Sequence, residues 1–262
     1  MQKVRAKKAL GQHFLRNVQI AEAIADALSR YQMPILEVGP GMGVLTEYLL
    51  QKYPHTKVVE LDPESVSYLK VAFPNLIPDI IEADFLKLPL DKVYNGEPFL
   101  LIGNYPYNIS SQIFFHMLEY KEMIPAAAGM LQKEVAIRLA SGAGNKDYGI
   151  LSVLLQAWYD VEYLFSVSPQ HFSPPPKVQS GVIRMQRNDR VTLGCDESLF
   201  KSVVKTTFNR RRKTIRNSLK PLIGEGEIPN SSSAYPYLQK RPEQLEVEDF
   251  IILTNAVADL LV

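Results

Sequence analysis

The sequence has a single cysteine, a net charge of only +1 and no long apolar run. Cys195 has no second cysteine with which to form an intramolecular disulfide. No stretch approaches the roughly 20 apolar residues of a transmembrane helix, and the basic N-terminal segment lacks the apolar core of a signal peptide. Internal repeats and low-complexity tracts are also missing. These absences argue against a disulfide-stapled secreted scaffold, a membrane protein and a repeat array, and they predict a cytoplasmic protein.

The low net charge hides an uneven distribution. Residues 1–16 hold five Lys or Arg side chains, residues 201–220 hold eight, and neither segment contains an acid. Two concentrated basic segments on an otherwise acidic chain indicate a ligand with a phosphate backbone. The alternative is that both runs are solvated helix faces. The basic residues are Lys3, Arg5, Lys7, Lys8, Arg16, Lys201, Lys205, Arg210, Arg211, Arg212, Lys213, Arg216 and Lys220.

The pattern of apolar segments predicts an α/β fold. With 262 residues, 46% of them hydrophobic, the chain is long enough for one domain with an appendage or for two unequal domains. Strand-length apolar runs alternate with helical patterns, as in a doubly wound parallel sheet. We expect a Rossmann-like domain over 1–186 and a small all-helical domain over 187–262. The expected strands are 34–38, 57–61, 77–82, 99–102 and 126–130, with 161–167 and 178–185 as an antiparallel edge. The expected helices include 20–28, 63–73, 110–119 with Ser110 as its N-cap, 133–140 and 148–159.

A glycine-rich turn follows the first expected strand. The segment Glu37–Gly43 has the spacing G-x-G-x-G, which lets the backbone turn sharply and approach a ligand closely. The G-x-G-x-x-G fingerprint of dinucleotide sites binds a pyrophosphate, whereas the shorter form suits a nucleoside without phosphate. Glu60 ends the second strand, where an acid can hold both ribose hydroxyls. Asp84 follows the third strand and can accept a hydrogen bond from an adenine amino group, while Phe85 packs on the ring. Together these residues predict S-adenosylmethionine as the cofactor.

A polar-aromatic tetrapeptide, Asn104-Tyr105-Pro106-Tyr107, follows the fourth expected strand. In an open α/β sheet the ligand crevice lies at this end of the strands. The Asn104 side-chain oxygen and the carbonyl of Tyr105 or Pro106 can accept both hydrogens of an exocyclic amine, and Tyr107 can stack on a flat ring. We interpret the motif as the catalytic site for methyl transfer to adenine N6, in which positioning does most of the catalysis. Phe172 is expected to close the other face of the base, although both aromatic rings could instead be core residues.

Motifs spread along the chain resemble a known family. They are Leu10–Leu15, the glycine turn, Glu60–Asp62, Asn104–Ser110, Met130–Glu134, His171–Ser180 and Phe208–Leu219. Through these segments, the chain resembles the small-subunit ribosomal RNA adenine dimethyltransferases over nearly its whole length. The last two segments are the most specific. The resemblance implies a class I methyltransferase fold. It also implies transfer of four methyl groups from S-adenosylmethionine to two adjacent adenines in the terminal hairpin loop of small-subunit rRNA, during late maturation of that subunit.

The resemblance and the motifs together assign site residues. His13 and Tyr105 depart from the family pattern, which usually has Asn and Leu at these positions. No metal site is expected. The expected cofactor-binding residues are Gln12, His13, Leu15, Gly39, Gly41, Glu60, Asp84, Phe85 and Asn104.

The C-terminal basic run is predicted to contact RNA. Projected as one helix, residues 200–220 place an apolar row on one side and most of the basic side chains on the other. Arg211 falls near the apolar side, so we expect it to be a structural, hydrogen-bonding arginine. The run Pro174–Pro176 predicts an extended segment that shapes the substrate cleft. The expected phosphate contacts are Lys205, Arg212, Lys213 and Arg216.

We therefore expect a monomer that binds the small ribosomal subunit and its rRNA. A methyltransferase of the macrolide-resistance type, acting on large-subunit rRNA, is an alternative against which the proline run and the basic C-terminal segment argue. An enzyme that modifies DNA adenine or a protein glutamine would lack this C-terminal segment. A third alternative is an assembly factor of the small subunit for which methylation is secondary.

Overall fold

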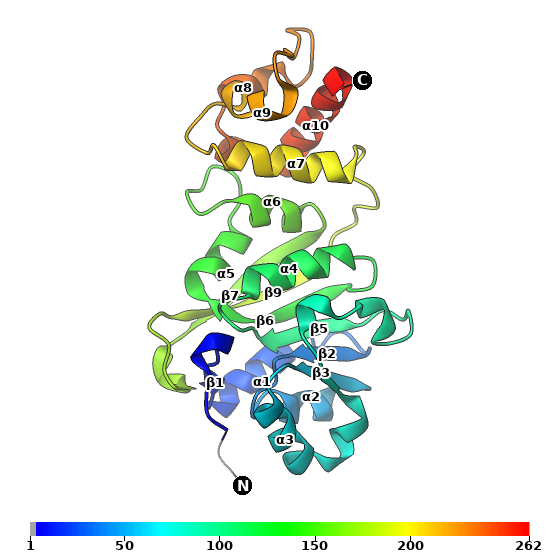
Figure 1. The fold of residues 1–262 in the computed structure, drawn as a ribbon, viewed down its shortest axis with the longest axis vertical. Coiled ribbons are helices and arrows are strands. Elements are labelled where there is room, and N and C mark those ends of the chain that lie inside the picture. Colours follow the sequence, from blue (N-terminus) through cyan, green and yellow to red (C-terminus); the bar gives the residue numbers. More distant parts are fainter. Residues whose placement is uncertain (1–3, 262) are drawn as a thin grey trace. The chain divides into compact units, whose positions relative to one another are not determined.

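The computed structural model describes residues 4–261, which divide into two compact units (Figure 1). Unit one comprises the chain up to Ile137 together with Val161–Arg187, and unit two comprises Arg138–Asp160 together with the chain from Asn188 onward. The division after Arg187 lies one residue from the expected domain boundary. The inclusion of Arg138–Asp160 in unit two was not expected. The basic residue Lys3 lies outside the described residues.

A seven-stranded sheet forms the centre of unit one, in the order β4-β3-β2-β5-β6-β9-β7. Parallel ladders run outward from β2, through β3 to β4 on one side and through β5 to β6 on the other, and β9 pairs antiparallel with β6. Because the direction of the strand order reverses between β2 and β5, the carboxyl ends of these strands border a switch-point crevice. The strands are β2 (Ile35–Val38), β3 (Thr56–Glu60), β4 (Ile80–Glu82), β5 (Leu100–Asn104), β6 (Ala126–Gln132), β7 (Tyr159–Val167) and β9 (Ser180–Arg187).

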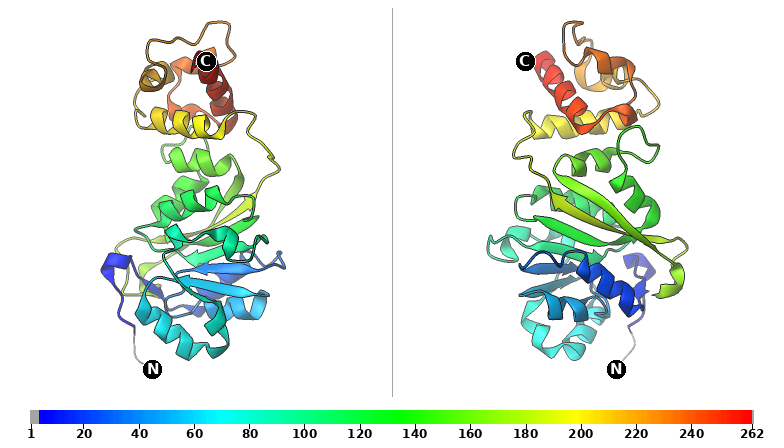
Figure 2. Two further views of the ribbon diagram at one scale, coloured as in Figure 1. Left: turned by 45° about the vertical axis from the view of Figure 1, so that its right-hand side comes forward. Right: turned by 180° about the vertical axis from the view of Figure 1, so that it is seen from behind.

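Helices cover both faces of the sheet, with α1 on one face and α4 on the other (Figures 1 and 2). Every residue of β2 is buried, as expected for a parallel strand that is covered on both sides. Alternate strand residues point to opposite faces, and Ile35 and Leu100 share one core cluster with Ile24 of α1. The helices with residues in unit one are α1 (Val18–Asp26), α2 (Thr46–Lys52), α3 (Pro63–Ala72), α4 (Ser110–Glu119) and α5 (Lys133–Ala140).

Three local features of unit one differ from the expected elements. The strand expected at 77–82 is reduced to β4, because Pro74–Asp79 forms a 3₁₀ helix that contains Pro78. Ser110 is the first residue of α4 and not its N-cap, a position that Ile109 occupies without a side-chain cap. A two-stranded antiparallel sheet that was not expected joins β1 (Phe14–Leu15) to β8 (Phe172–Ser173).

Unit two is helical. Asp196 caps α7 by accepting a hydrogen bond from the Leu199 amide at 2.6 Å, and the Phe208 ring at the end of α7 lies 5.9 Å from that of Phe250 in α10. The segment Leu151–Leu155 of α6 is buried and packs against α7, which explains why Arg138–Asp160 belongs to this unit. The helices that lie wholly in this unit are α6 (Ile150–Gln156), α7 (Glu197–Phe208), α8 (Ile215–Ser218), α9 (Lys220–Ile223) and α10 (Val247–Leu261).

The projection of residues 200–220 as one helix was wrong. Helix α7 ends at Phe208, a series of tight turns follows, and α8 begins only at Ile215. Thr214, the N-cap of α8, is extended (φ −66°, ψ 158°), so the helical geometry is interrupted there. The basic residues 210–213 therefore lie in a turn. Within residues 4–261, no helix is both long and apolar enough to cross a bilayer.

Candidate active site

A pocket of about 240 Å³ opens at the carboxyl ends of the central strands of unit one. We call residues 7–15 the N-terminal arm. Residues 10–15 of this arm line the pocket, together with the glycine turn and the loop that follows β5. The four residues of the expected catalytic motif, Asn104, Tyr105, Pro106 and Tyr107, all line it. The structure also brings every expected cofactor-binding residue to this pocket: Gln12, His13, Leu15, Gly39, Gly41, Glu60, Asp84, Phe85 and Asn104.

The glycine turn requires glycine for two reasons. Gly39 and Gly41 have φ of 68° and 57°, the left-handed region that side chains disfavour. A Cβ atom at Gly41 would also lie 2.9 Å from the ring of Phe14 in the N-terminal arm. The turn can therefore approach both the arm and a ligand only because it carries no side chain there.

Glu60, at the end of β3, is held by backbone donors. The Gly41 amide donates to Oε2 at 3.1 Å and the Asp62 amide donates to Oε1 at 2.9 Å. Burial raises the pKa of Glu60, an effect that these two hydrogen bonds oppose. A carboxylate offers about four acceptor positions, so Glu60 keeps capacity for the hydroxyls of a ligand.

Glu37, for which the sequence suggested no role, is a second buried acid in the pocket wall. It is 1% exposed, and its Oε2 accepts a hydrogen bond from the Thr46 hydroxyl at 2.6 Å. Burial raises the pKa of Glu37 to about 8, and the nearby Glu60 adds to this rise. The signal that could have identified it is an acid inside an otherwise apolar strand, directly before the glycine turn.

Asp84 and Phe85 form the side of the pocket that follows β4. The Leu86 amide donates to Asp84 Oδ1 at 3.0 Å, which fixes the carboxylate at the start of a short 3₁₀ helix. Phe85 is 4% exposed, and its ring meets the His116 ring edge-on at a centroid distance of 5.4 Å. This side of the pocket thus presents an acceptor beside an apolar ring, as recognition of adenine requires.

Asn104 ends β5 with its side chain oriented by the arm. Its Nδ2 donates to the His13 carbonyl at 3.0 Å, so Oδ1 is the atom left to accept a hydrogen bond. Tyr105 is 1% exposed and its hydroxyl donates to the Ala128 carbonyl at 2.9 Å. A Cβ atom at Gly129 would lie 2.5 Å from the Tyr105 ring, so the bulky residue fits because Gly129 has no side chain. The Tyr105 side chain is therefore a core group.

Tyr107 and Phe172, the two aromatics expected to contact a base, lie in different surroundings. Tyr107 is half-buried in the pocket wall, with its hydroxyl hydrogen-bonded to that of Ser180 and its ring 5.3 Å from that of His13. Phe172 is 3% exposed, pairs with Leu15 between β8 and β1, and belongs to the main core cluster. The expectation that Phe172 closes a substrate site was wrong, because this strand pairing turns its ring into the core.

The basic turn in unit two lines a more open hollow. Arg212 and Lys213 are exposed there, and the Arg216 guanidinium lies 5.7 Å from the centre of the Tyr235 ring. Arg211 is held differently, since its Nη2 donates to the Lys146 carbonyl at 2.6 Å. The expectation that Arg211 is a structural, hydrogen-bonding arginine is confirmed.

The comparison with known proteins decides the family. A model of the family described as ribosomal RNA adenine dimethylase matches residues 3–258. The chain belongs to this family. A curated relative from Bacteroides thetaiotaomicron, called ribosomal RNA small subunit methyltransferase A, is 60% identical over 262 residues, which cover 100% of this chain and 97% of the relative. A protein of the same name from Flavobacterium johnsoniae is 55% identical over 258 residues, covering 98% and 97%.

Solved structures resemble most of this chain. A dimethyladenosine transferase from Plasmodium falciparum has a TM-score of 0.79 at 22% identity, covering 95% of this chain and 99% of that one. The 23S rRNA methyltransferase ErmE has a TM-score of 0.70 at 24% identity, covering 94% and 99%. At such identities the similarity concerns the fold alone. The expected class I methyltransferase fold is confirmed.

The family uses S-adenosylmethionine as its methyl donor, and the pocket fits this molecule. The pocket brings together an acid at the end of β3, a turn without side chains after β2, and an acceptor with an apolar ring after β4. These are the groups that the sequence predicted for ribose, a closely packed nucleoside and adenine. Among the described residues there is no group of three or more His, Cys, Asp or Glu side chains suited to a metal ion.

Proposed function

We propose that the protein dimethylates N6 of two adjacent adenines in the terminal hairpin loop of small-subunit rRNA, using S-adenosylmethionine, during late maturation of the subunit. Asn104 carries the proposal. It lies at the carboxyl end of β5 in the pocket wall, with Nδ2 engaged by the His13 carbonyl and Oδ1 directed to accept. The names of the relatives that are 55–60% identical support the small subunit as the source of the RNA.

The bound donor supplies an electrophilic methyl group on a sulfonium, so the protein's task is to position the adenine amine. The N6 lone pair is delocalised into the ring, and hydrogen bonds from its two hydrogens favour a pyramidal nitrogen. Asn104 Oδ1 is one acceptor. The Pro106 carbonyl already accepts from the Ile109 amide at 3.2 Å, which favours the Tyr105 carbonyl as the second. The Tyr105 amide donates to the Met130 carbonyl at 2.9 Å, which holds this part of the loop against β6.

The second methyl transfer acts on a changed nucleophile. After the first transfer N6 retains one hydrogen, so only one of the two acceptors remains in use. Tyr107 stacks on the extruded base, a contact worth roughly 1 to 3 kcal/mol in single-strand sites. A loop adenine is already partly unpaired, which lowers the cost of extruding it.

The two units divide this work. Unit one holds the donor and performs the transfer, and unit two contacts the rRNA. Cations on α7, in the basic turn and on α8 bind phosphates. The protein acts as a cytoplasmic monomer on the small subunit. The proposed phosphate contacts are Lys205, Arg212, Lys213 and Arg216.

The test is labelled-methyl transfer to unmethylated small subunits, large subunits and naked rRNA in parallel. We expect transfer to small subunits and none to large subunits. Asn104→Ala should lower transfer roughly 10² or more while donor and RNA binding stay within about tenfold, because this interaction acts mainly in the transition state. Ser111→Ala, at an exposed position of α4 just after the same loop, is the control. Methylation of large subunits would refute the substrate, and a near-normal single-turnover rate of Asn104→Ala would refute the role of that residue.

A further inference from the structure

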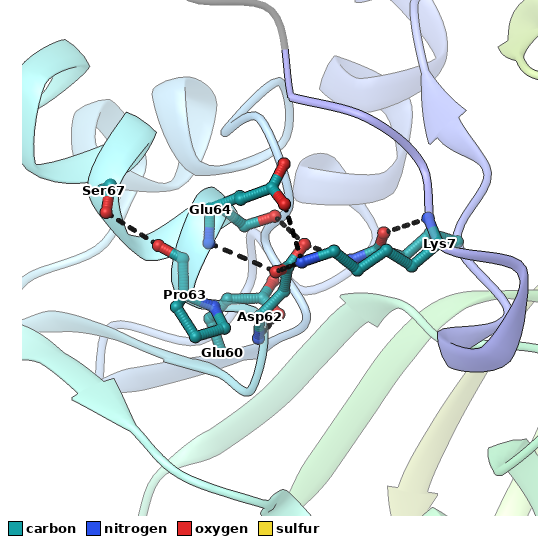
Figure 3. Close-up of polar contacts among 8 residues, drawn as sticks. Lys7, Glu60, Asp62, Pro63, Glu64 and Ser67 are labelled. Carbon is teal, nitrogen blue, oxygen red and sulfur yellow. Dashed lines mark hydrogen bonds and ion pairs between the residues drawn. The ribbon is translucent and has the colours of Figure 1, made fainter.

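The N-terminal arm is fastened to the donor-binding side of the pocket by one cluster of charges (Figure 3). Lys7 Nζ lies 2.5 Å from Asp62 Oδ1 and 3.0 Å from Glu64 Oε1. From the same arm, Gln12 Nε2 donates to Asp62 Oδ2 at 3.1 Å, while Gln12 Oε1 accepts from the Lys7 amide at 2.8 Å. Two arm side chains thus converge on one carboxylate, and each of its oxygens receives one of them.

The carboxylate of Asp62 is an unusual anchor, because its side chain is 0% exposed whereas that of Lys7 is 37% exposed. Burial acts to raise the pKa of Asp62, but hydrogen bonds led by those from Lys7 and Gln12 outweigh burial and lower it. The buried charge therefore draws much of its compensation from the arm, with the Glu64 amide and the Ser65 hydroxyl as further donors. Loss of the arm's cation would leave that charge buried and less well compensated.

Asp62 is also joined directly to the residue proposed to hold the ribose. Its amide donates to Glu60 Oε1 at 2.9 Å, and its carboxylate accepts from the Glu64 amide at 3.2 Å as the N-cap of α3. The short segment 60–62 thus presents one carboxylate to the pocket and the next one to the arm. The two carboxylates are therefore connected through the Asp62 amide.

Other residues of the arm are tied to the catalytic loop. Besides the bond between Asn104 and the His13 carbonyl, Asn108 Nδ2 donates to the Ala9 carbonyl at 3.3 Å. A Cβ atom at Gly11 would lie 2.4 Å from Asn108 Oδ1, so the arm and the loop are in close contact. The arm therefore spans the pocket, with the ionic cluster on one side and amide hydrogen bonds on the other.

We propose that Lys7 and Asp62 form a latch that holds the arm closed over the methyl donor. Opening of this latch sets the rate at which S-adenosylmethionine enters and S-adenosylhomocysteine leaves. The inference rests on the proposed function. Arm residues contribute directly to the pocket wall, so a bound nucleoside exchanges faster when the arm is released. Since the proposed dimethylation of two adenines consumes four donors, exchange occurs repeatedly on each substrate. Asp62 and Lys7 are positioning residues in this scheme.

The test compares two neighbouring lysines of the arm. Lys7→Gln removes the cation of the latch, whereas Lys8→Gln makes the same charge change at an exposed neighbour. The probe is S-adenosylhomocysteine, with its affinity measured by calorimetry and its dissociation rate by stopped flow. We expect Lys7→Gln to accelerate dissociation about tenfold, as for loss of a charge-assisted hydrogen bond, and to weaken affinity by a smaller factor because release of the arm also speeds entry. Lys8→Gln should match the wild type, and Lys7→Arg should restore most of the effect because it keeps the charge.

Other outcomes separate the latch from its alternatives. If the arm's charges serve only RNA, Lys7→Gln and Lys8→Gln will weaken rRNA binding equally and leave the dissociation rate unchanged, which would overturn the latch. A second measurement needs no substitution: dissociation from the wild type should accelerate with ionic strength, because the partly exposed Lys7 is screened by salt, and a salt-independent rate would also overturn it. Failure of the wild type to bind S-adenosylhomocysteine would refute the proposed function itself.

Discussion

Replacing Glu37 with glutamine should change how stability depends on pH. The carboxyl is 1% exposed, and burial raises its pKa from 4.5 to about 8. Between these values the folded protein retains a proton at Glu37 that the unfolded chain releases, so the free energy of unfolding falls as pH rises through this window. Each pKa unit corresponds to about 1.4 kcal/mol. The total cost above pH 8 is therefore on the order of 5 kcal/mol, an upper bound because a buried site relaxes around a charge.

Glutamine keeps the shape of the side chain, still accepts the Thr46 hydrogen bond and does not titrate. In urea unfolding at pH 5, 6, 7 and 8, the stability of Glu37→Gln relative to the wild type should rise by about 1.4 kcal/mol per pH unit, with the variant the more stable at pH 8. Glu47→Gln, at an exposed position of α2, is the control. Parallel pH profiles for Glu37→Gln and the wild type would refute the reasoning.

Three further predictions concern the charged residues of both units. Reversing Arg212 and Lys213 to Glu should weaken binding to small subunits in filter assays and lower the log–log salt slope by roughly 0.7 to 0.9 per lost phosphate contact; an unchanged slope would make the basic turn a solvated surface. Arg211→Ala should lower the melting temperature and leave RNA affinity nearly unchanged, because its guanidinium donates to the Lys146 carbonyl. Weaker RNA binding at an unchanged melting temperature would contradict this role. Glu60→Gln should weaken S-adenosylmethionine binding by on the order of 1 to 3 kcal/mol in calorimetry, and unchanged affinity would remove Glu60 from the site.

The positions of the central strands could be predicted because each is a short apolar run bounded by polar or glycine residues. Residues far apart in sequence, such as Gly39, Glu60 and Asp84, follow different strands and still line one pocket. Parallel strands bring their carboxyl ends to the same edge of the sheet, so local patterns were sufficient to group them. The grouping required no knowledge of side-chain contacts.

Residues placed by long-range packing could not be predicted in this way. Phe172 beside a proline run has no local signal that distinguishes a base-stacking ring from a core ring, and its pairing with Leu15 decides the matter. Helix α6 is buried through most of its length, and its apolar pattern does not specify which unit covers it. The basic run of 210–213 suggested a continuous helix because nearby apolar residues fitted a helical period, and the extended Thr214 interrupts it.

The pairing of β1 with β8 also constrains when the pocket can be completed during synthesis. Phe14 and Leu15 leave the ribosome early, whereas their partners Ser173 and Phe172 are made only after six of the seven strands of the main sheet. N-terminal parts of a protein generally fold first during synthesis. Here, however, β1 can pair only after β8, which lies near the end of unit one, has been made. A nascent chain that ends at Gln132 has the glycine turn and all five parallel strands, but it lacks the strand on which the arm docks. The pocket is therefore completed late, when most of unit one has been synthesised.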